Sequence, residues 1–249
     1  MTEIEMQAIK DEAIKNGTFM KAPNGKPTNL NERQWLQVRT KAFKKWFGDW
    51  EKAAIVKAIR KLSAVPEKSL EDGETYESVY KNIGNATNEN DGTTVRFFNT
   101  AFKKIVKEGG LSERSIPSLK DAFEKAVLAY TETDKLGGED RKDGTKHKEH
   151  KNIDEYRNYI GKVTIDGDVH YVRFTATMQK GNNGIHSFFV TNIDVYENAK
   201  GNTSFKDLLQ TSVSSDGVID TKLQKFFEEA NEAEKNSSKI VDENGEPSL

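Results

Sequence analysis

Three strand-like runs in the second half of the chain constrain the possible folds most strongly. They read YRNYIGKVTI (156–165), VHYVRFTATM (169–178) and IHSFFVTNIDVYE (185–197). Asp166-Gly167 joins the first two runs, and an Asp-Gly pair favours the tight turn of a two-residue β-hairpin. The second connection, KGNNG, is also rich in Gly and Asn. The pattern predicts a three-stranded antiparallel meander.

The segments just before these runs predict the rest of a compact domain. TTVRFF (93–98) alternates like a short fourth strand, and the run after it has helical apolar spacing until Gly109-Gly110. A second helix is predicted after Pro117, with an apolar face of Leu119, Ala122, Phe123, Ala126, Val127 and Tyr130. We therefore predict an α+β domain over residues 93–197, in which a small antiparallel sheet of three to four strands packs on two helices.

The remaining segments divide the chain further. Residues 63–92 are polar and rich in turn-forming residues, which predicts a linker with at most one short helix. Residues 1–62 contain helical patterns, and residues 198–249 hold a helical segment that becomes acidic toward its end. We expect an N-terminal helical region and a C-terminal helix and tail outside the α+β domain.

All three tryptophans lie in one basic stretch, WLQVRTKAFKKWFGDWEK (35–52). Asn31 and Gln34 have the spacing of a capping box just before it, and Thr40 can begin a second helix. The aromatic residues recur every three to four positions, so they predict a stripe that docks a helix on a neighbour. The alternative is that exposed rings stack on nucleobases between the lysines, which helical spacing disfavours.

Composition restricts the possible classes of function. The formal net charge is −2, so nucleic-acid binding has to come from a local basic patch. Cysteine is absent, which excludes disulfides, thiolate nucleophiles and thiolate metal ligands. The sequence contains no glycine-rich phosphate loop, no GxSxG motif and no apolar run of about 18 residues. We expect neither a cofactor nor a membrane partner, and we expect a soluble, intracellular protein.

The four histidines are candidate acid–base groups. His147 and His150 lie in a charged loop over residues 131–151, where their HxxH spacing lacks the glutamate and the third ligand of a zinc protease. We therefore expect no metal site there. His170 and His186 fall on predicted strands, where a half-buried or surface histidine is the usual case.

These residues can be assembled into a site for metal-independent RNA cleavage. His147 or His150 can act as the base or the acid, because histidine titrates near neutral pH. Arg173 can bind the phosphate, and Thr175 and Thr177 share its strand face and can donate hydrogen bonds. The lysines of the loop can attract the RNA backbone; they are Lys142, Lys146, Lys148 and Lys151. A solvated loop beside an ordinary amphipathic strand explains the same residues, and the residues alone favour that alternative.

The stretch NGKPTNLNERQWLQVRTKAFKKWFGDWE resembles a cassette of large polyvalent proteins from phages and conjugative elements, especially those of gut Bacteroidetes. Lys41 stands where that cassette commonly has proline. The final stretch, SSKIVDENGEPSL (237–249), resembles a segment that usually follows the cassette closely and leads into a further domain. The resemblance implies a modular protein that contacts virion or other mobile-element proteins through its Trp35–Trp50 helix. Whether a downstream domain is missing stays open.

A second resemblance covers residues 93–197. VRFFNTAFKKIVKEGG and KHKEHKNIDEYRNYIGKVTIDGDVHYVRFTATM are similar to phage-type domains grouped with barnase, EndoU, colicin and RelE-like nucleases. They equally resemble the related large polyvalent protein-associated domains. The nuclease resemblance implies that His147 or His150 occupies the family's histidine position. Arg173 and Thr175 occupy the positions of its basic residue and threonine.

Two functions follow as hypotheses. The first is a phage or mobile-element protein with a nuclease-like domain that cleaves RNA without a metal. The second is a catalytically inactive virion-associated, cargo or interaction protein. A third, an ADP-ribosyltransferase fragment, rests only on the domain that usually follows the terminal cassette. An enzyme gathers His147 or His150, Arg173 and Thr175 in one cleft, whereas an inactive domain scatters them.

Overall fold

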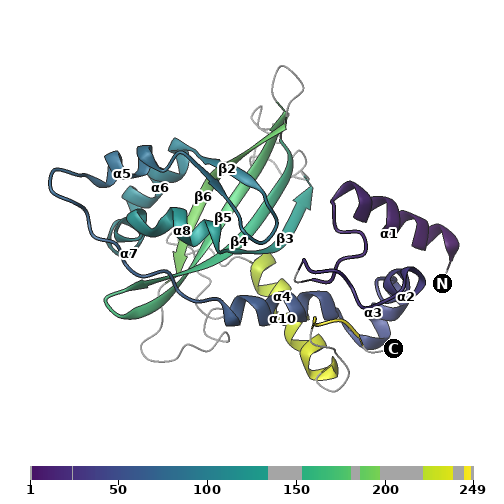
Figure 1. Cartoon of the computed structure of the whole chain (residues 1–249). Coiled ribbons are helices and arrows are strands. Elements are labelled where there is room, and N and C mark those ends of the chain that lie inside the picture. The colour runs from purple at the N-terminus through teal and green to yellow at the C-terminus, as the bar shows by residue number, and fades with distance from the viewer. Residues whose placement is uncertain are drawn as a thin grey trace, which may run out of the picture. The chain divides into compact units, whose positions relative to one another are not determined.

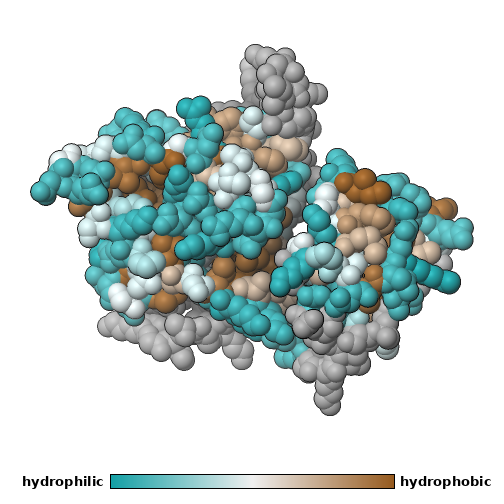
Figure 2. Space-filling view, in the orientation of Figure 1, coloured by the Kyte–Doolittle hydropathy of each residue, from teal (hydrophilic) through white to brown (hydrophobic). Residues whose placement is uncertain are grey.

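The structure, a computed structural model, describes residues 2–23, 25–133, 153–180, 186–196, 221–237 and 244–247. The chain forms two compact units, and each is treated separately below. The terminal unit comprises Met1–Lys61 and Thr221–Leu249, and the central unit comprises Leu62–Asp220. Hydrophilic residues cover most of the visible surface of both units, with apolar residues showing between them (Figure 2). Within the described ranges, no helix is long and apolar enough to cross a membrane.

The central unit is built on a six-stranded mixed sheet (Figure 1). Its strands are β1 (Asn85–Thr87), β2 (Thr94–Phe97), β3 (Val127–Thr133), β4 (Ile153–Ile165), β5 (Asp168–Lys180) and β6 (His186–Tyr196). They lie in the order β1-β2-β6-β5-β4-β3. The β2–β6 pair is parallel, and the other neighbouring pairs are antiparallel.

The predicted meander corresponds to β4, β5 and β6. Ile165 pairs with Asp168, so Asp166 and Gly167 form the two-residue turn between β4 and β5. Both turn residues have positive φ, at 54° and 85°, as the type I′ turn requires.

The predicted small antiparallel sheet of three to four strands is wrong, because β1 and β3 extend the sheet and the β2–β6 pair makes it mixed. The helix predicted after Pro117 is also shorter than expected. Helix α8 (Leu119–Glu124) ends before Val127, where β3 begins. Val127 and Tyr130 fit a helical face by spacing, but β-branched and aromatic residues also suit a strand, and pairing with β4 decides between them.

The helices of the central unit lie on one face of the sheet (Figure 1). They are α5 (Tyr76–Asn82), α6 (Asn99–Glu108), α7 (Gly110–Arg114), the short 3₁₀ helix η1 (Ile116–Ser118) and α8. Their apolar side chains bury against that face in one core. Phe123 of α8 lies at its centre, with ring centroids 5.1 Å from Tyr159 and 5.5 Å from Phe174.

Residues 63–92, predicted as a polar linker, contribute to this core. They contain α5 and β1, and Tyr80, Ile83 and Ala86 are buried in the core cluster. Their few apolar residues are spread among polar ones, so composition alone resembles that of a linker. The structure accordingly starts the central unit at Leu62.

The terminal unit is helical. Its helices are α1 (Glu3–Lys15), α2 (Glu32–Gln37), α3 (Lys41–Phe47), α4 (Trp50–Lys61) and α10 (Thr221–Ser237). The capping box of Asn31 and Gln34 is present, and Thr40 caps α3. Gly48 separates α3 from α4 with φ 98°, and a Cβ there would lie 2.9 Å from the Cα of Ala233. The predicted aromatic stripe is therefore split between helices, and α10 packs closely against the break.

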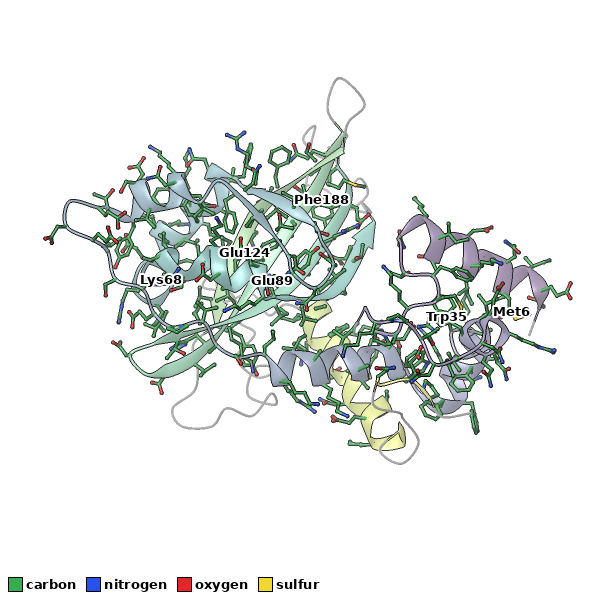
Figure 3. All side chains as sticks on the ribbon, in the orientation of Figure 1. Met6, Trp35, Lys68, Glu89, Glu124 and Phe188 are labelled. Carbon is green, nitrogen blue, oxygen red and sulfur yellow. The ribbon has the colours of Figure 1, made fainter. Side chains whose placement is uncertain are left out.

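The aromatic residues of the terminal unit have different roles. Trp35 (labelled in Figure 3) and Trp50 are each 1% exposed, and their ring nitrogens donate to the carbonyl oxygens of Lys21 and Val38. The Arg39 guanidinium carbon lies 3.7 Å from the Trp35 ring centroid and 5.0 Å from that of Trp50. Trp46, in contrast, is 76% exposed. Two tryptophans are thus packing residues, and one lies at the surface.

The second half of the terminal unit is held to the first by polar contacts. Buried Glu246 accepts hydrogen bonds from the Thr28 hydroxyl at 2.6 Å and from the Asn29 backbone at 3.3 Å. Its other carboxylate oxygen lies 3.9 Å from Arg39. The C-terminal cassette is therefore part of the same unit as the tryptophan stretch.

Gly161→Ala should destabilise the central unit. A Cβ at this position in β4 would lie 2.7 Å from the carbonyl oxygen of Ala122 in α8, which is backbone and cannot move aside alone. Overpacking of this kind costs about 1–3 kcal/mol. Urea unfolding followed by circular dichroism measures it, and Thr164→Ala, at a half-buried position of the same strand, is the control. An unchanged midpoint for Gly161→Ala would show that α8 and β4 are not in close contact.

Glu246→Gln should destabilise the terminal unit, because it removes the charge that accepts the hydrogen bonds of Thr28 and Asn29. Hydrogen bonds to charged groups contribute about 1.5–3 kcal/mol. Tryptophan fluorescence reports on this unit alone, since it holds every tryptophan of the chain. Glu228→Gln, on an exposed position of α10, should leave the unfolding curve in place. Equal curves for the two variants would contradict the role of Glu246.

Candidate functional site

The face of the sheet opposite the helices carries the predicted site residues of β5. Val172, Phe174 and Ala176 belong to the helix-side core. Successive side chains of a strand alternate between faces, so Arg173 and Thr175 lie on the opposite face. They therefore share a face, as predicted. We call their side chains, with those of Tyr130, Asn158, Asn192 and Asp194, the polar face.

Strand register arranges the polar face in two rows. The first row crosses four strands, because Tyr130 pairs with Asn158, Asn158 with Thr175, and Thr175 with Asn192. In the second row, Arg173 pairs with Ile160 on one side and with Asp194 on the other. Directly opposed side chains of neighbouring strands have Cβ atoms about 5 Å apart, so each row is a set of direct neighbours.

A buried ion-pair network lies at one end of the second row. Asp194 is 3% exposed, and one of its oxygens accepts from Arg173 Nε at 3.0 Å, from Arg173 Nη2 at 2.6 Å and from Asn192 Nδ2 at 2.8 Å. Its other oxygen accepts from Lys104 Nζ of α6 at 2.5 Å. Lys104 also lies 3.7 Å from Glu108. The carboxylate is thus fully paired and fixes the orientation of Arg173.

The environment sets the charge of each group in this network. Burial raises the pKa of the Asp194 carboxyl, but the charges and hydrogen bonds of Arg173 and Lys104 outweigh burial and lower the pKa below its usual value. Burial raises the pKa values of the Tyr130 and Tyr196 hydroxyls. At neutral pH, Asp194 is therefore ionised and a weak base, whereas both tyrosines keep their protons.

Asn158 is one of the polar-face residues that the sequence analysis did not name as a site residue. Its side-chain oxygen accepts a hydrogen bond from the Thr175 hydroxyl at 3.1 Å. Its side-chain nitrogen is buried without a hydrogen-bond partner, and the whole residue is 3% exposed. An unpaired buried donor costs about 1–3 kcal/mol. One sequence signal was available, since asparagine is disfavoured inside a strand and here interrupts the run YRNYIG.

The histidines do not join Arg173 in the part of the chain that the structure describes. His170 pairs with Val163 of the helix-side core, so it lies on the other face, and its Nδ1 is 3.3 Å from the carbonyl oxygen of Tyr196. His186 begins β6, but its side chain is outside the description. His147 and His150 lie outside the described residues, as do the predicted RNA-binding lysines Lys142, Lys146, Lys148 and Lys151.

The polar face can bind an oxygen-rich group but has a limited capacity for acid–base chemistry. The Asn158 amide nitrogen has unused N–H donors, Thr175 pairs with it and donates to its oxygen, and Arg173 lies in the next row. Asp194 is too weak a base at its lowered pKa to take a hydroxyl proton efficiently. Among the described residues, no group of three or more His, Asp or Glu side chains is placed to hold a metal ion.

The central unit is thus an α+β domain with helices on one face of a mixed sheet and a polar cluster on the other. Residues 69–189 match the family model of large polyvalent protein-associated domain 3. The matched segment is 121 of the 249 residues (189 − 69 + 1), runs from before α5 into β6, and includes Asn158, Arg173 and Thr175. The match supports the predicted resemblance to the polyvalent protein-associated group. No curated protein and no solved structure matches the chain.

Asp194→Asn should make the free energy of unfolding of the central unit less dependent on pH in the acidic range. Because the folded-state pKa of Asp194 is lowered, its stabilising contribution is full above the unfolded pKa, near 3.8, and is lost as pH falls through the folded pKa. At pH 7 the variant should lose about 3–5 kcal/mol, the usual result of breaking a buried pair. The difference from wild type should shrink when urea unfolding is repeated near pH 3. A difference that stays the same at both pH values would contradict the assigned pairing.

Proposed function

We propose that the chain is a protein of a phage or another mobile element, and that its central domain cleaves RNA at the polar face without a metal. The match to a domain of large polyvalent proteins supports the first part. The placement of Arg173 beside Thr175 and Asn158 on one sheet face carries the second part.

In this proposal, the polar face binds the phosphate that is cleaved. The fixed guanidinium of Arg173 stabilises the negative charge that develops on the phosphoryl oxygens, and the Thr175 hydroxyl, which donates to Asn158, holds that amide in the neighbouring row. Asp194 bonds to Nε and Nη2 of Arg173 and so acts as a positioning residue for that side chain. Preorganised donors of this kind are worth more than mobile ones because they need no reorientation during the reaction.

Proton transfer in this proposal falls to the loop that contains His147 and His150. One histidine takes the proton of the 2′-hydroxyl, and a second group protonates the leaving 5′-oxygen. In the same proposal, the RNA backbone is attracted by the lysines of this loop, Lys142, Lys146, Lys148 and Lys151. RNA is the proposed substrate class, because its own 2′-hydroxyl is the nucleophile. The 2′-oxygen attacks the phosphorus as the bond to the 5′-oxygen breaks, so no water has to be activated by a metal.

A second candidate function is a catalytically inactive virion-associated or cargo protein. One observation in the central unit favours it: the charge of Arg173 is already countered by Asp194, as in an ordinary structural ion pair. One observation in the terminal unit also favours it. Trp46 is 76% exposed on a helix that carries Lys41, Lys44 and Lys45, which suits contact with a protein partner. For either function, we propose that the protein is located in the bacterial host cytoplasm or in the phage virion.

Purified wild-type protein should cleave a labelled pool of total RNA in the presence of EDTA. His147→Ala/His150→Ala should lower the rate about 100-fold or more, the contribution typical of acid–base groups. Arg173→Lys keeps a positive charge beside Asp194 but loses the planar fork, and should lower the rate about tenfold or more. Arg96→Ala, at an exposed arginine on β2, is the matched control and should cleave like wild type.

Intact RNA with the wild-type protein would contradict the cleavage proposal and favour the inactive interaction protein. Cleavage that persists in the histidine double variant would exclude the loop as the source of the acid and base. Cleavage that is equal in Arg173→Lys and Arg96→Ala would exclude Arg173 as the phosphate ligand.

A further inference from the structure

The Asn158 amide nitrogen presents its two N–H donors without a partner. Its oxygen accepts from the Thr175 hydroxyl, which assigns the oxygen to the β5 side and leaves the nitrogen as the group without a partner. Strand register holds the residue between Tyr130 on β3 and Thr175 on β5. The side chain is therefore oriented on both sides before any ligand binds.

A buried asparagine whose side-chain nitrogen has no partner lowers the stability of the fold, so a structural role alone does not explain it. An apolar residue of similar volume would fill the position without an unsatisfied nitrogen. Functional sites commonly retain such groups at a cost in stability. The group that would complete Asn158 is an acceptor, because its amide nitrogen can only donate.

The surrounding charges indicate which acceptor fits. Arg173 lies in the adjacent row of the polar face, and Lys104 approaches the same network from α6. On the same face of β4, Lys162 is 9% exposed and donates to the carbonyl oxygen of Leu62. Glu132, two positions after Tyr130 on the same face of β3, is a third carboxylate beside those of Asp194 and Glu108, so cations and carboxylates around the polar face are equal in number. Arg173 is the cation of the row next to Asn158, and its charge favours an anionic oxygen at this point over a neutral carbonyl.

We infer that the Asn158 side-chain nitrogen donates a hydrogen bond to a phosphoryl oxygen of the substrate, beside Arg173. This inference rests on the proposed function, since it assigns a specific ligand atom to the same face. Asn158 contacts the phosphate directly, and Thr175 positions it through the hydroxyl-to-amide hydrogen bond. The phosphate then has a charged donor and a neutral donor from neighbouring strands.

Titration of isotope-labelled full-length protein with inorganic phosphate tests this assignment. The Asn158 side-chain NH₂ signal is identified in nitrogen-15 spectra by its absence in Asn158→Leu. It should shift on addition of phosphate and stay in place on addition of uridine, a nucleoside without phosphate. Asn158→Leu should weaken phosphate binding about tenfold or more, as expected for loss of a hydrogen bond to a charged group. Asn85→Ala, at an exposed asparagine of β1, should bind like wild type.

The midpoint of thermal unfolding separates a binding role from a structural role. Asn158→Leu should keep the Tm close to the wild-type value, because it removes a buried unsatisfied nitrogen but also the acceptor of the half-buried Thr175 hydroxyl, which water can then satisfy. A large fall in Tm with unchanged phosphate binding would overturn the inference. A signal that shifts with uridine alone would also overturn it, because the acceptor of the amide hydrogen bond would then be a base carbonyl. A signal that shifts with neither probe would overturn it as well, because the acceptor would then be a bound water. A shift with phosphate in a protein that leaves RNA intact would sustain the phosphate contact and refute only the cleavage.

Discussion

The register of the β4–β5 hairpin is the constraint on which the rest of the central unit depends. The turn at Asp166 and Gly167 fixes that register, and a slip of one residue would exchange the two faces of a strand. Phe174 would then leave the core, and Arg173 would enter it. The same two-residue turn therefore determines both the packing of the helices and the composition of the polar face.

The polar face contains a buried carboxylate whose charge has to be paired. A buried carboxylate is unfavourable by itself, and Asp194 is tolerated because Arg173, Lys104 and Asn192 all donate to it. Lys104 belongs to α6, which packs on the other side of the sheet through Ala101 and Ile105. A helix of the core thus takes part in orienting a guanidinium on the opposite face.

Sequence patterns predicted the local features and missed those that depend on distant pairing. The Asp-Gly turn, the capping box of Asn31 and Gln34 and the three long strands are encoded within a few residues, so they could be found. The parallel β2–β6 pair and strand β3 depend on partners far along the chain, and Val127 fits either a helix or a strand locally. Arg173 and Thr175 were named from one strand. Asp194 and Asn158 were not, because their importance comes from register and burial.

The two halves of the terminal unit show how a chain can accommodate a large inserted domain. Arg60 of α4 bonds Glu234 of α10 at 2.7 Å and 2.8 Å, and Gly48 lets Ala233 approach the backbone closely. Glu246 adds hydrogen bonds to Thr28 and Asn29. These contacts join segments that lie on either side of Leu62–Asp220, so the terminal unit closes only after the central unit has been synthesised. Closing that long loop costs little more entropy than closing a shorter one, since the cost rises only with the logarithm of length.

Trp35 and Trp50 take part in the contact between the two halves of the terminal unit. Both rings pack around the Arg39 guanidinium, which also lies 3.9 Å from the Glu246 carboxylate. The two tryptophans therefore bury the cation that the C-terminal segment contacts.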